Sequence, residues 1–473
     1  MKRILSLLLC VLLLLTCLIG CANKEEDNTD TNDTVSTNTE EINDFPDIPK
    51  QDNGGVEFNI LYPKWQLYDG SYYFADGMYG DVVGDQSYQR MMLIEEHLGI
   101  KIVPIITTND AFNGVLDVMN KVRIAGMTGD DSYQMALSHC FNGIASVATG
   151  GFLSDFQDIP NIDLEAEYWR KSQMEQVAID GGMYFGSGSF IIPDPCVMLF
   201  NKDIVNSFTG LSADDLYQSV RDKKWTLEKM KQYASAVNTE GSYGFVTVGD
   251  WEMIALMTAE GYYTATQKSD GAYELLNFNE KIDNICRAVD TLYEAEYSSS
   301  LTQEEKNNAI STGKAMFSTS GLSSCISVVS QSSSALGILP YPSVSEDVEH
   351  QNLDWSGYMV IPNMVQNKEL AGAVAELLCY YGEKNIYPAF YDKLLGSRTA
   401  KNLEDSEMLD IIFDTVVHDP GLTFCNGAQT NLGYMLYVIP KTVEPEGGVE
   451  VSSYFQKYYS SAVTQLNELK IKE

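Results

Sequence analysis

The chain has 473 residues, and its 66 acidic residues against 31 Lys and Arg give a formal net charge of -35, which makes nucleic acid and anionic lipid poor partners. It has four histidines but no HExxH arrangement, GxSxG elbow, Walker A loop or dinucleotide fingerprint, so no catalytic residue is assigned. Roughly 420 residues follow Gly55, more than one core normally supports, and two domains are therefore expected.

The N-terminal segment has the layout of a secretory signal. Two basic residues precede an apolar run from Ile4 to Leu15, and that run is shorter than the roughly 20 residues of a membrane-spanning helix. The run ends at Leu18-Ile19-Gly20-Cys21, which resembles the bacterial lipoprotein box. The resemblance implies that residues 1–20 are removed as a signal peptide and that Cys21 is lipidated.

The next segment, residues 21–50, is predicted to be a disordered acidic tether. Asn, Asp, Glu and Thr dominate it, and it has few residues that could build a core. Its like charges repel one another and keep it extended. We therefore expect an extracytoplasmic protein that contacts the membrane through its lipid anchor only.

The folded part opens with alternating strands and helices. Residues 56–62 and 100–106 are predicted strands, and residues 86–98 between them are a predicted helix, which together make a βαβ unit. Further along, Thr302 and Glu305 form a capping box that opens a helix ending near residue 313, and a strand is predicted to restart at 315–317.

A later helix has clear predicted ends. Asn367 can cap it, its apolar residues from Leu370 to Tyr381 line one face, and Gly382 is placed to end it. Repeated alternation of this kind predicts an α/β fold with mostly parallel pairing and repeated crossovers.

The cysteines give no metal site. Beyond the predicted signal and Cys21, six remain, widely scattered, with no CxxC pair and no His at zinc-finger spacing. Buried free thiols and disulfides both remain open. The six are Cys140, Cys196, Cys286, Cys325, Cys379 and Cys425.

Several short strings, taken together, resemble the extracellular solute-binding proteins of ATP-driven importers, family 1, the maltose-binding type. No single string is diagnostic, but their order and spacing behind a lipoprotein signal are quite specific to that family. They are residues 131–137, 150–155, 180–186, 197–203, 224–228, 313–317, 337–342 and 367–371.

The resemblance implies a periplasmic-binding-protein-like fold of class II type, with two α/β lobes joined by a hinge of about three crossings. The N-terminal lobe would take residues 56–192 plus 359–398, and the C-terminal lobe 197–355 plus 402–473. The crossings would lie near 192–195, 355–358 and 397–400. It also implies a monomer that closes on a small solute, most simply an oligosaccharide, and delivers it to ABC permease subunits without a cofactor.

Carbohydrate sites need flat aromatic platforms with hydrogen-bonding side chains at their edges. The predicted loop after the first strand, the loop after residue 138, the first crossing and the facing lobe supply both kinds of residue, and Asp354 stands beside one of the tryptophans. The candidate ligand-binding residues are Trp65, Tyr68, Tyr72, His139, Phe141, Asp194, Asp250, Trp251, Ser320, Trp355 and Tyr358.

Other interpretations remain open at this stage. Trp65, Trp251 and Trp355 are equally explained as buried structural residues, and Trp169 and Trp225 are predicted to be structural. A glycosidase-type carboxylate pair would make the protein an extracellular carbohydrate-active enzyme. A lipid-anchored surface adhesin that imports nothing would use similar aromatic surfaces. For a receptor, a peptide or a polyamine is the alternative ligand.

Overall fold

The computed structural model describes residues 45–63, 73–107, 111–141, 143–237, 239–249, 251–396, 403–426, 430–442 and 450–471. The predicted signal, Cys21 and most of the predicted tether lie outside these ranges. Pro46–Glu473 form one compact unit, to which the following description applies.

The first lobe is built on a four-stranded sheet in the order β12-β3-β1-β2. Strands β1 and β2 coincide with the two predicted strands, and β1 pairs in parallel with both β2 and β3. Strand β12 is antiparallel to β3. The strands are β1 (Val56–Tyr62), β2 (Ile100–Ile106), β3 (Met135–His139) and β12 (Gly357–Val360), and the helices of this lobe are α3 (Val82–Leu98), α4 (Ala111–Thr128), α5 (Ile144–Thr149) and α14 (Lys368–Tyr381).

The second lobe has a five-stranded sheet in the order β10-β4-β9-β5-β8. Strand β4 is antiparallel to both of its neighbours, whereas β5 is parallel to β8 and β9. Both sheets are therefore mixed: the first is mostly parallel, as predicted, and the second is half parallel and half antiparallel. The strands are β4 (Cys196–Asn201), β5 (Tyr243–Thr247), β8 (Ser298–Ser300), β9 (Ala315–Gly321) and β10 (Leu336–Pro340), with helices α7 (Lys202–Ser207), α8 (Ala213–Arg221), α9 (Leu227–Ala234), α12 (Gln303–Ser311), α13 (Leu322–Gln331) and α16 (Leu403–Asp414).

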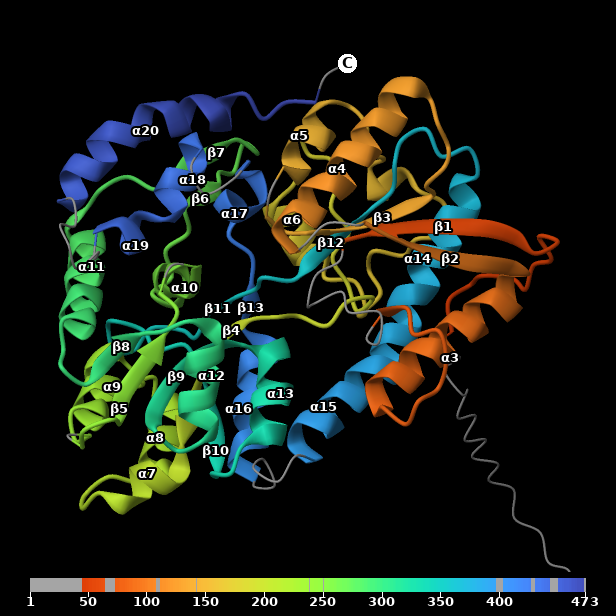
Figure 1. The fold of residues 1–473 in the computed structure, drawn as a ribbon. Helices are drawn as coiled ribbons and strands as arrows, with labels where there is room; N and C mark the ends of the chain where they lie inside the picture. The colour runs from red at the N-terminus through yellow and green to blue at the C-terminus, as the bar shows by residue number, and fades with distance from the viewer. Residues whose placement is uncertain are drawn as a thin grey trace, which may run out of the picture. The chain divides into compact units, whose positions relative to one another are not determined.

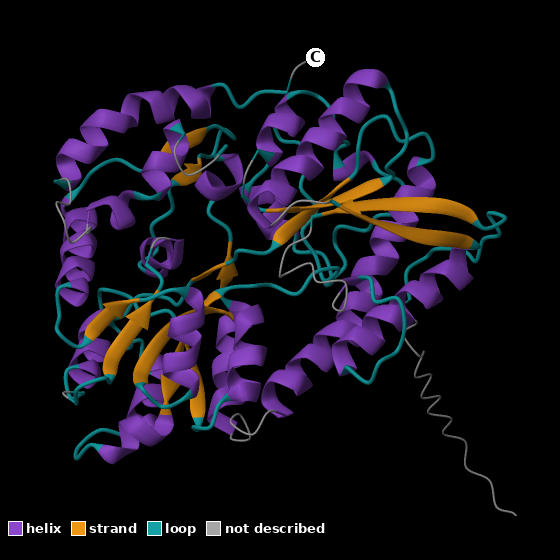
Figure 2. Cartoon of the chain, viewed as in Figure 1, coloured by secondary structure: helices purple, strands orange, loops and turns teal. Residues whose placement is uncertain are grey.

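A mostly helical layer completes the second lobe, and Figure 2 shows it as a group of purple helices around a short hairpin. Its elements are α10 (Trp251–Ala259), β6 (Ala265–Gln267), β7 (Tyr273–Leu275), α11 (Glu280–Tyr293), α17 (Pro420–Phe424), α18 (Asn431–Leu436), α19 (Val438–Thr442) and α20 (Val451–Asn467). The remaining elements are η2 (Phe156–Asp158), α6 (Lys171–Gln176), β11 (Asn352–Leu353), η3 (Gly382–Ile386), α15 (Tyr387–Gly396) and β13 (Val416–Val417).

Crossing segments connect the two sheets (Figure 1). The first leads through Pro193 and Pro195 into β4, and the second leads from Asp354 into β12. The two run antiparallel, with a β-bridge between Pro195 and Asp354. The predicted third crossing, residues 397–400, lies outside the described residues.

Both predicted helix caps are present. The side chain of Asn367 accepts a hydrogen bond from the backbone N–H of Leu370, 3.0 Å away, at the start of α14. Thr302 and Glu305 form the reciprocal capping box of α12. These caps satisfy backbone N–H groups that have no partner inside their helices.

The α-helix α14 ends at Tyr381 with Gly382 as its C-cap, as predicted, but Gly382 does not turn the chain away from the helix axis. Its φ is -59° and its ψ is -51°, so the backbone stays right-handed and continues through the π-helical turn η3 into α15. A Cβ atom on Gly382 would overlap the carbonyl oxygen of Ser189. Glycine is needed here because another backbone approaches closely, and not because the chain turns.

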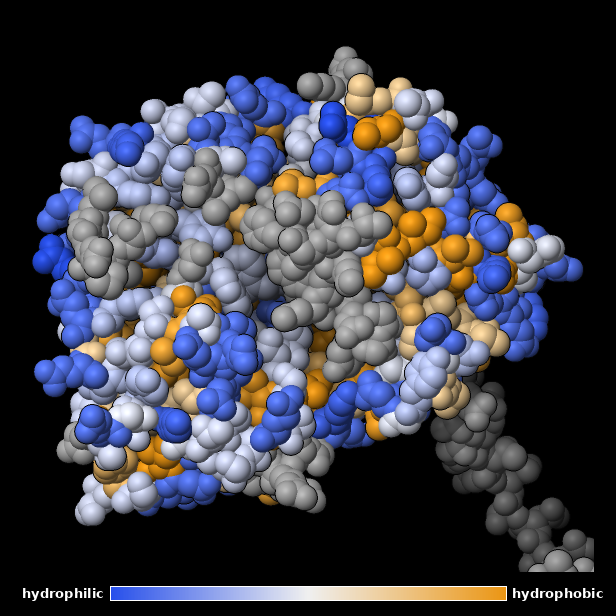
Figure 3. Space-filling view, viewed as in Figure 1, coloured by the Kyte–Doolittle hydropathy of each residue, from blue (hydrophilic) through white to orange (hydrophobic). Residues whose placement is uncertain are grey.

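The surface and the core agree with the composition. Hydrophilic side chains cover most of the face shown in Figure 3. All six cysteines that follow residue 21 are buried free thiols, which is the first of the two states that the sequence left open. None of the helices that the structure describes combines the length and apolar character of a membrane-spanning segment.

We predict that Gly382→Ala destabilises the protein by roughly 2 kcal/mol or more, because the added methyl group has no room beside the Ser189 backbone. Urea denaturation would measure the loss. The control is Lys384→Ala, which places alanine at an exposed position of the same turn and should change the free energy of unfolding little. Equal stability of Gly382→Ala and the wild type would contradict the close backbone contact.

Candidate functional site

Four aromatic side chains from both lobes meet at the second crossing, and we call them the ring cluster: His139, Phe141, Trp251 and Trp355. Trp355 is central. Its ring centroid lies 5.4 Å from that of Trp251 in an edge-to-face arrangement, 6.1 Å from His139 and 6.3 Å from Phe141. His139, the last residue of β3, and Phe141, two residues later, belong to the first lobe, and Trp251 begins α10 of the second, so the cluster bridges the lobes at their connection.

Trp251 is the half-buried member of the ring cluster, whereas the other three side chains are buried. Trp355 is 7% exposed, and its indole N–H makes no hydrogen bond within the described part of the chain, although the thiol of Cys196 is close to it. An indole N–H usually finds a partner when buried. Because Trp251 is only half-buried, its ring offers the accessible surface of the cluster, and the buried ring of Trp355 packs edge-to-face against it.

His139 is held as a neutral imidazole. It ends strand β3, it is 2% exposed, and burial lowers its pKa to about 4, against a smaller opposite effect of the Asp354 carboxylate. Its Nδ1 accepts a hydrogen bond from the backbone N–H of Phe141 at 3.2 Å. Nδ1 is therefore an acceptor, and the ring helps to fix the chain that carries Phe141.

Asp194 ties the first crossing to helix α13. Its carboxylate accepts from the backbone N–H of Ser323 at 2.7 Å, in the first turn of that helix, where a negative charge is favourable. The residue is 7% exposed, and burial raises the pKa of its carboxyl to about 7. A Cβ on Gly321 would press against the same carboxylate, so glycine leaves room for it.

Asp354 joins the two crossings through its buried carboxylate. One oxygen accepts from the backbone N–H groups of Asp194 and Ser356, both at 2.8 Å, and the other accepts from the Ser356 hydroxyl at 2.6 Å. Asp354 is 0% exposed. From the sequence, Asp354 is recognisable only as a neighbour of Trp355, because nothing in the sequence distinguishes a buried junction carboxylate from an exposed one.

A buried ion pair lies directly behind Trp251. Glu252, which follows Trp251 in the sequence, forms a salt bridge with Lys306, and both side chains are fully buried. Lys306 also donates to the carbonyl of Thr319 at 2.7 Å, and Glu252 accepts from the backbone N–H of Val248 at 3.0 Å. This network fixes the first turn of α10 against β9 and thereby orients Trp251.

Two predicted ligand residues lie inside strands. Ser320 is within β9, 2% exposed, and its hydroxyl donates to the carbonyl of Gly321. Tyr358 is within β12, fully buried, with its hydroxyl 2.9 Å from that of Thr423 and its ring against Phe185. Both side chains are therefore already bonded within the protein. The structure does bring together the four predicted residues of the ring cluster, and Asp194 lies beside them at the first crossing.

The other candidates divide into two groups. Trp65, Tyr68, Tyr72 and Asp250 lie outside the described residues. Trp169 and Trp225, which were predicted to be structural, are buried, and their indole N–H groups donate to the Glu376 carboxylate at 2.7 Å and to the Pro340 carbonyl at 2.8 Å. Within the described ranges, no group of three or more His, Cys, Asp or Glu side chains could hold a metal ion.

The fold is similar to those of solved ABC transporter solute-binding proteins. The GacH receptor of Streptomyces glaucescens, solved unliganded and with acarbose, has a TM-score of 0.56 at 12% identity over 86% of this chain and 99% of that one. A Listeria monocytogenes substrate-binding protein in complex with cycloalternan gives 0.58 at 11% identity, over 88% of this chain and all of that one. A Thermotoga lettingae protein bound to α-D-tagatose gives 0.55 at 14% identity, with the same coverage.

These similarities define the fold class: two α/β lobes of the periplasmic-binding-protein type, joined by several crossings, as the sequence resemblance implied. The sequence matches no protein-family model and no curated protein.

We predict that Lys306→Met destabilises the protein by about 3–5 kcal/mol, because it leaves the Glu252 carboxylate buried without its partner. Chemical denaturation would show the loss. Arg287→Met is the matched control, since it breaks an ion pair with Asp283 in which the arginine side chain is 74% exposed, and it should cost less than about 1 kcal/mol. Equal losses in the two variants would contradict the structural role of the buried pair.

The raised pKa of Asp194 predicts a pH effect on stability. Because the native carboxyl titrates at about 7 rather than 3.8, its protonated form stabilises the fold fully below pH 3.8, and this contribution is lost as the pH rises to 7. Asp194→Asn removes the dependence. The free energy of unfolding of the variant minus that of the wild type should therefore rise as the pH increases from 4 to 7, by up to roughly 4 kcal/mol.

The comparison with the wild type is essential for this test. The lowered pKa of His139 makes the free energy of unfolding fall as the pH drops from 6.5 through about 4. This effect is opposite in sign to that of Asp194 and covers nearly the same pH range. This contribution is common to both proteins and cancels in their difference. A difference in the free energy of unfolding that stays constant from pH 4 to 8 would contradict the buried titration of Asp194.

Proposed function

We propose that this protein is a non-enzymatic receptor, anchored by a lipid on Cys21 at the extracytoplasmic face of a bacterial membrane, that binds an oligosaccharide and delivers it to an ABC permease. The ring cluster carries the proposal, because it holds the accessible ring of Trp251, from the second lobe, against buried rings of the first lobe at the connection between the lobes. The similar structures add support, since they were solved with acarbose, cycloalternan and tagatose.

The proposed mechanism is capture without chemistry. Sugars present C–H faces that stack on rings and hydroxyl groups that need hydrogen-bond partners. A sugar on Trp251 contacts the second lobe, while the residues following β3 belong to the first. A ligand that touches both lobes favours the closed form, because it binds that form more tightly than the open one.

The remaining details follow the sequence resemblance. The lobe boundaries are 56–192 plus 359–398 and 197–355 plus 402–473, the receptor acts as a monomer, and residues 21–50 hold it off the lipid surface. Delivery requires the closed form to dock on permease subunits. Trp65, Tyr68, Tyr72 and Asp250 are proposed to complete the ligand site.

A ligand screen on Pro46–Glu473, the compact unit, tests this function. Neutral oligosaccharides, short peptides and polyamines would each be tested by thermal shift, and a ligand at a hundred times its dissociation constant should add about 2.7 kcal/mol. Stabilisation by one oligosaccharide class, with the sugar recovered intact, supports the receptor. Cleavage of the sugar would establish an enzyme instead, and binding of polymer alone would establish an adhesin.

We predict that Trp251→Ala weakens binding of that oligosaccharide about tenfold to thirtyfold, because it removes the accessible stacking surface. Isothermal titration calorimetry would measure the dissociation constant. Tyr79→Ala is the control, since it removes an aromatic side chain that is 77% exposed and outside the ring cluster. Unchanged affinity in Trp251→Ala, with Tyr79→Ala also unchanged, would contradict the placement of the sugar.

A further inference from the structure

A second concave site lies outside the ring cluster and takes its walls from both lobes. It has a larger part of about 740 Å³ and a smaller part of about 320 Å³, and Ser172 and Gln176 line both parts. Helix α6 contributes these residues from one side, while α16 and the segment around β13 face them. We call this site the acidic groove. Its volume is ample for a small molecule.

The charge of the groove is strongly negative. Six carboxylates line its two parts against one guanidinium, that of Arg170. None of the six forms a salt bridge with another described residue, although Glu383 and Asp410 accept hydrogen bonds from the hydroxyls of Ser189 and Tyr391. The six are Glu167, Glu175, Glu383, Asp392, Asp410 and Asp414.

Two further acceptors in the groove are buried and lack partners among the described residues. The carbonyl oxygen of the Gln176 side chain is one, and Nδ1 of His418 is the other. His418 is 1% exposed and lines the smaller part. Buried polar atoms without partners are rare, and these two point to a missing donor. Nη1 of Arg170, in the larger part, is also buried without a partner among the described residues, and as a donor it calls for an acceptor instead.

The protonation of His418 identifies Nδ1 as an acceptor. Its Nε2 lies 3.1 Å from the side-chain oxygen of Gln173, which also accepts from Ser187, and 3.8 Å from the Asp354 carboxylate. Nε2 therefore carries the hydrogen. Burial also lowers the pKa of His418, so the ring is neutral and Nδ1 has a free lone pair.

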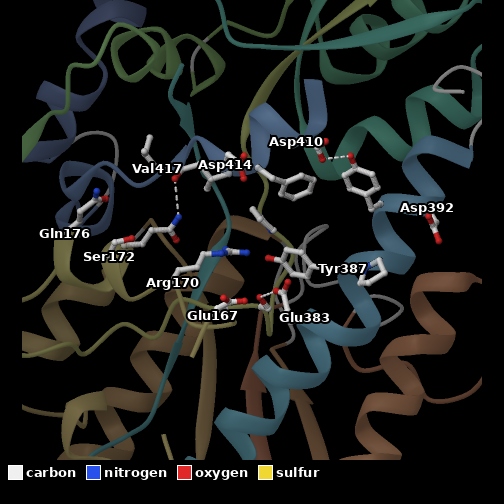
Figure 4. Close-up of a pocket in the computed structure, with 17 residues that line it drawn as sticks. Glu167, Arg170, Ser172, Gln176, Glu383, Tyr387, Asp392, Asp410, Asp414 and Val417 are labelled. Atoms are coloured by element: carbon white, nitrogen blue, oxygen red, sulfur yellow. Dashed lines mark hydrogen bonds between the residues drawn. The ribbon is translucent and has the colours of Figure 1, made fainter. Parts of the chain in front are cut away.

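Arg170 occupies one side of the groove only. Figure 4 shows its guanidinium pointing toward Tyr387, with Glu167 and Glu383 near it, while Asp414 and Asp410 lie across the groove. The guanidinium carbon is 5.6 Å from the centre of the Tyr387 ring. Arg170 therefore offsets its neighbouring carboxylates and leaves the opposite wall and the Gln176 end negative.

We propose that the acidic groove binds a linear aliphatic polyamine. A chain of several ammonium groups supplies the hydrogen-bond donors that Gln176 and His418 lack, and it carries the charge that the carboxylates attract. No three of the carboxylates are close enough to hold one metal ion, whereas a chain molecule can reach them in succession. Its methylene groups can pack on Phe413 and Tyr387, which also line the larger part.

Calorimetric titration of spermidine into the full chain at about 0.15 M salt tests the proposal, since ordinary surface attraction is screened there. We expect one site. Glu175→Gln with Asp414→Asn, which removes one charge from the Gln176 end and one from the wall opposite Arg170, should weaken binding at least about tenfold. Gln176→Leu should also weaken it while keeping the thermal midpoint, because that side-chain oxygen has no hydrogen bond to lose.

The control is Glu294→Gln with Glu296→Gln, which removes two negative charges at exposed positions outside the groove. Retained spermidine affinity in this control and in Trp251→Ala would place the polyamine in the groove. Equal weakening by control and groove variants would mean general attraction to an acidic protein and overturn the proposal, as would no detectable binding at millimolar spermidine. The oligosaccharide screen is independent of each of these results.

Discussion

The arrangement of both lobes depends on one buried carboxylate, that of Asp354. It accepts hydrogen bonds from the backbone of the first crossing at Asp194 and from Ser356 in its own crossing, while its backbone N–H donates to Val417 at 2.9 Å. A buried charge without such partners would cost several kcal/mol. The crossings are therefore locked in register where the lobes join.

The same carboxylate is electrostatically connected to both candidate sites. It opposes the burial effects on the pKa of His139, in the ring cluster, and of Arg170, in the acidic groove. Each site also takes residues from both lobes, so a change in the angle between the lobes changes both. Ligands at the two sites would then influence each other's affinity to the same extent, as linkage requires.

Local sequence patterns predicted the local structure well, and failed where distant contacts decide. The strands β1 and β2 and the caps at Asn367 and Thr302 rest on neighbouring residues, and all are confirmed. Gly382 follows the last residue of α14, as predicted, but its right-handed backbone and its close contact with Ser189 could not be predicted, because Ser189 is far away in the sequence. Whether Tyr358 faces outward depends on strand register, which a sequence does not fix.

The acidity of the chain has more than one physical origin. Solubility explains scattered surface charge, but carboxylates gathered along one groove, beside two buried acceptors, repel one another and are not needed for solubility. His418 and Gln173 share a hydrogen bond although they are 245 residues apart in the sequence. This bond occupies Nε2 of His418 and leaves its Nδ1 without a partner among the described residues, so the acceptor could be found only from the structure. A neutral aromatic cluster and an acidic groove attract different molecules, so the two ligands do not compete for one site, although their affinities would be linked through Asp354.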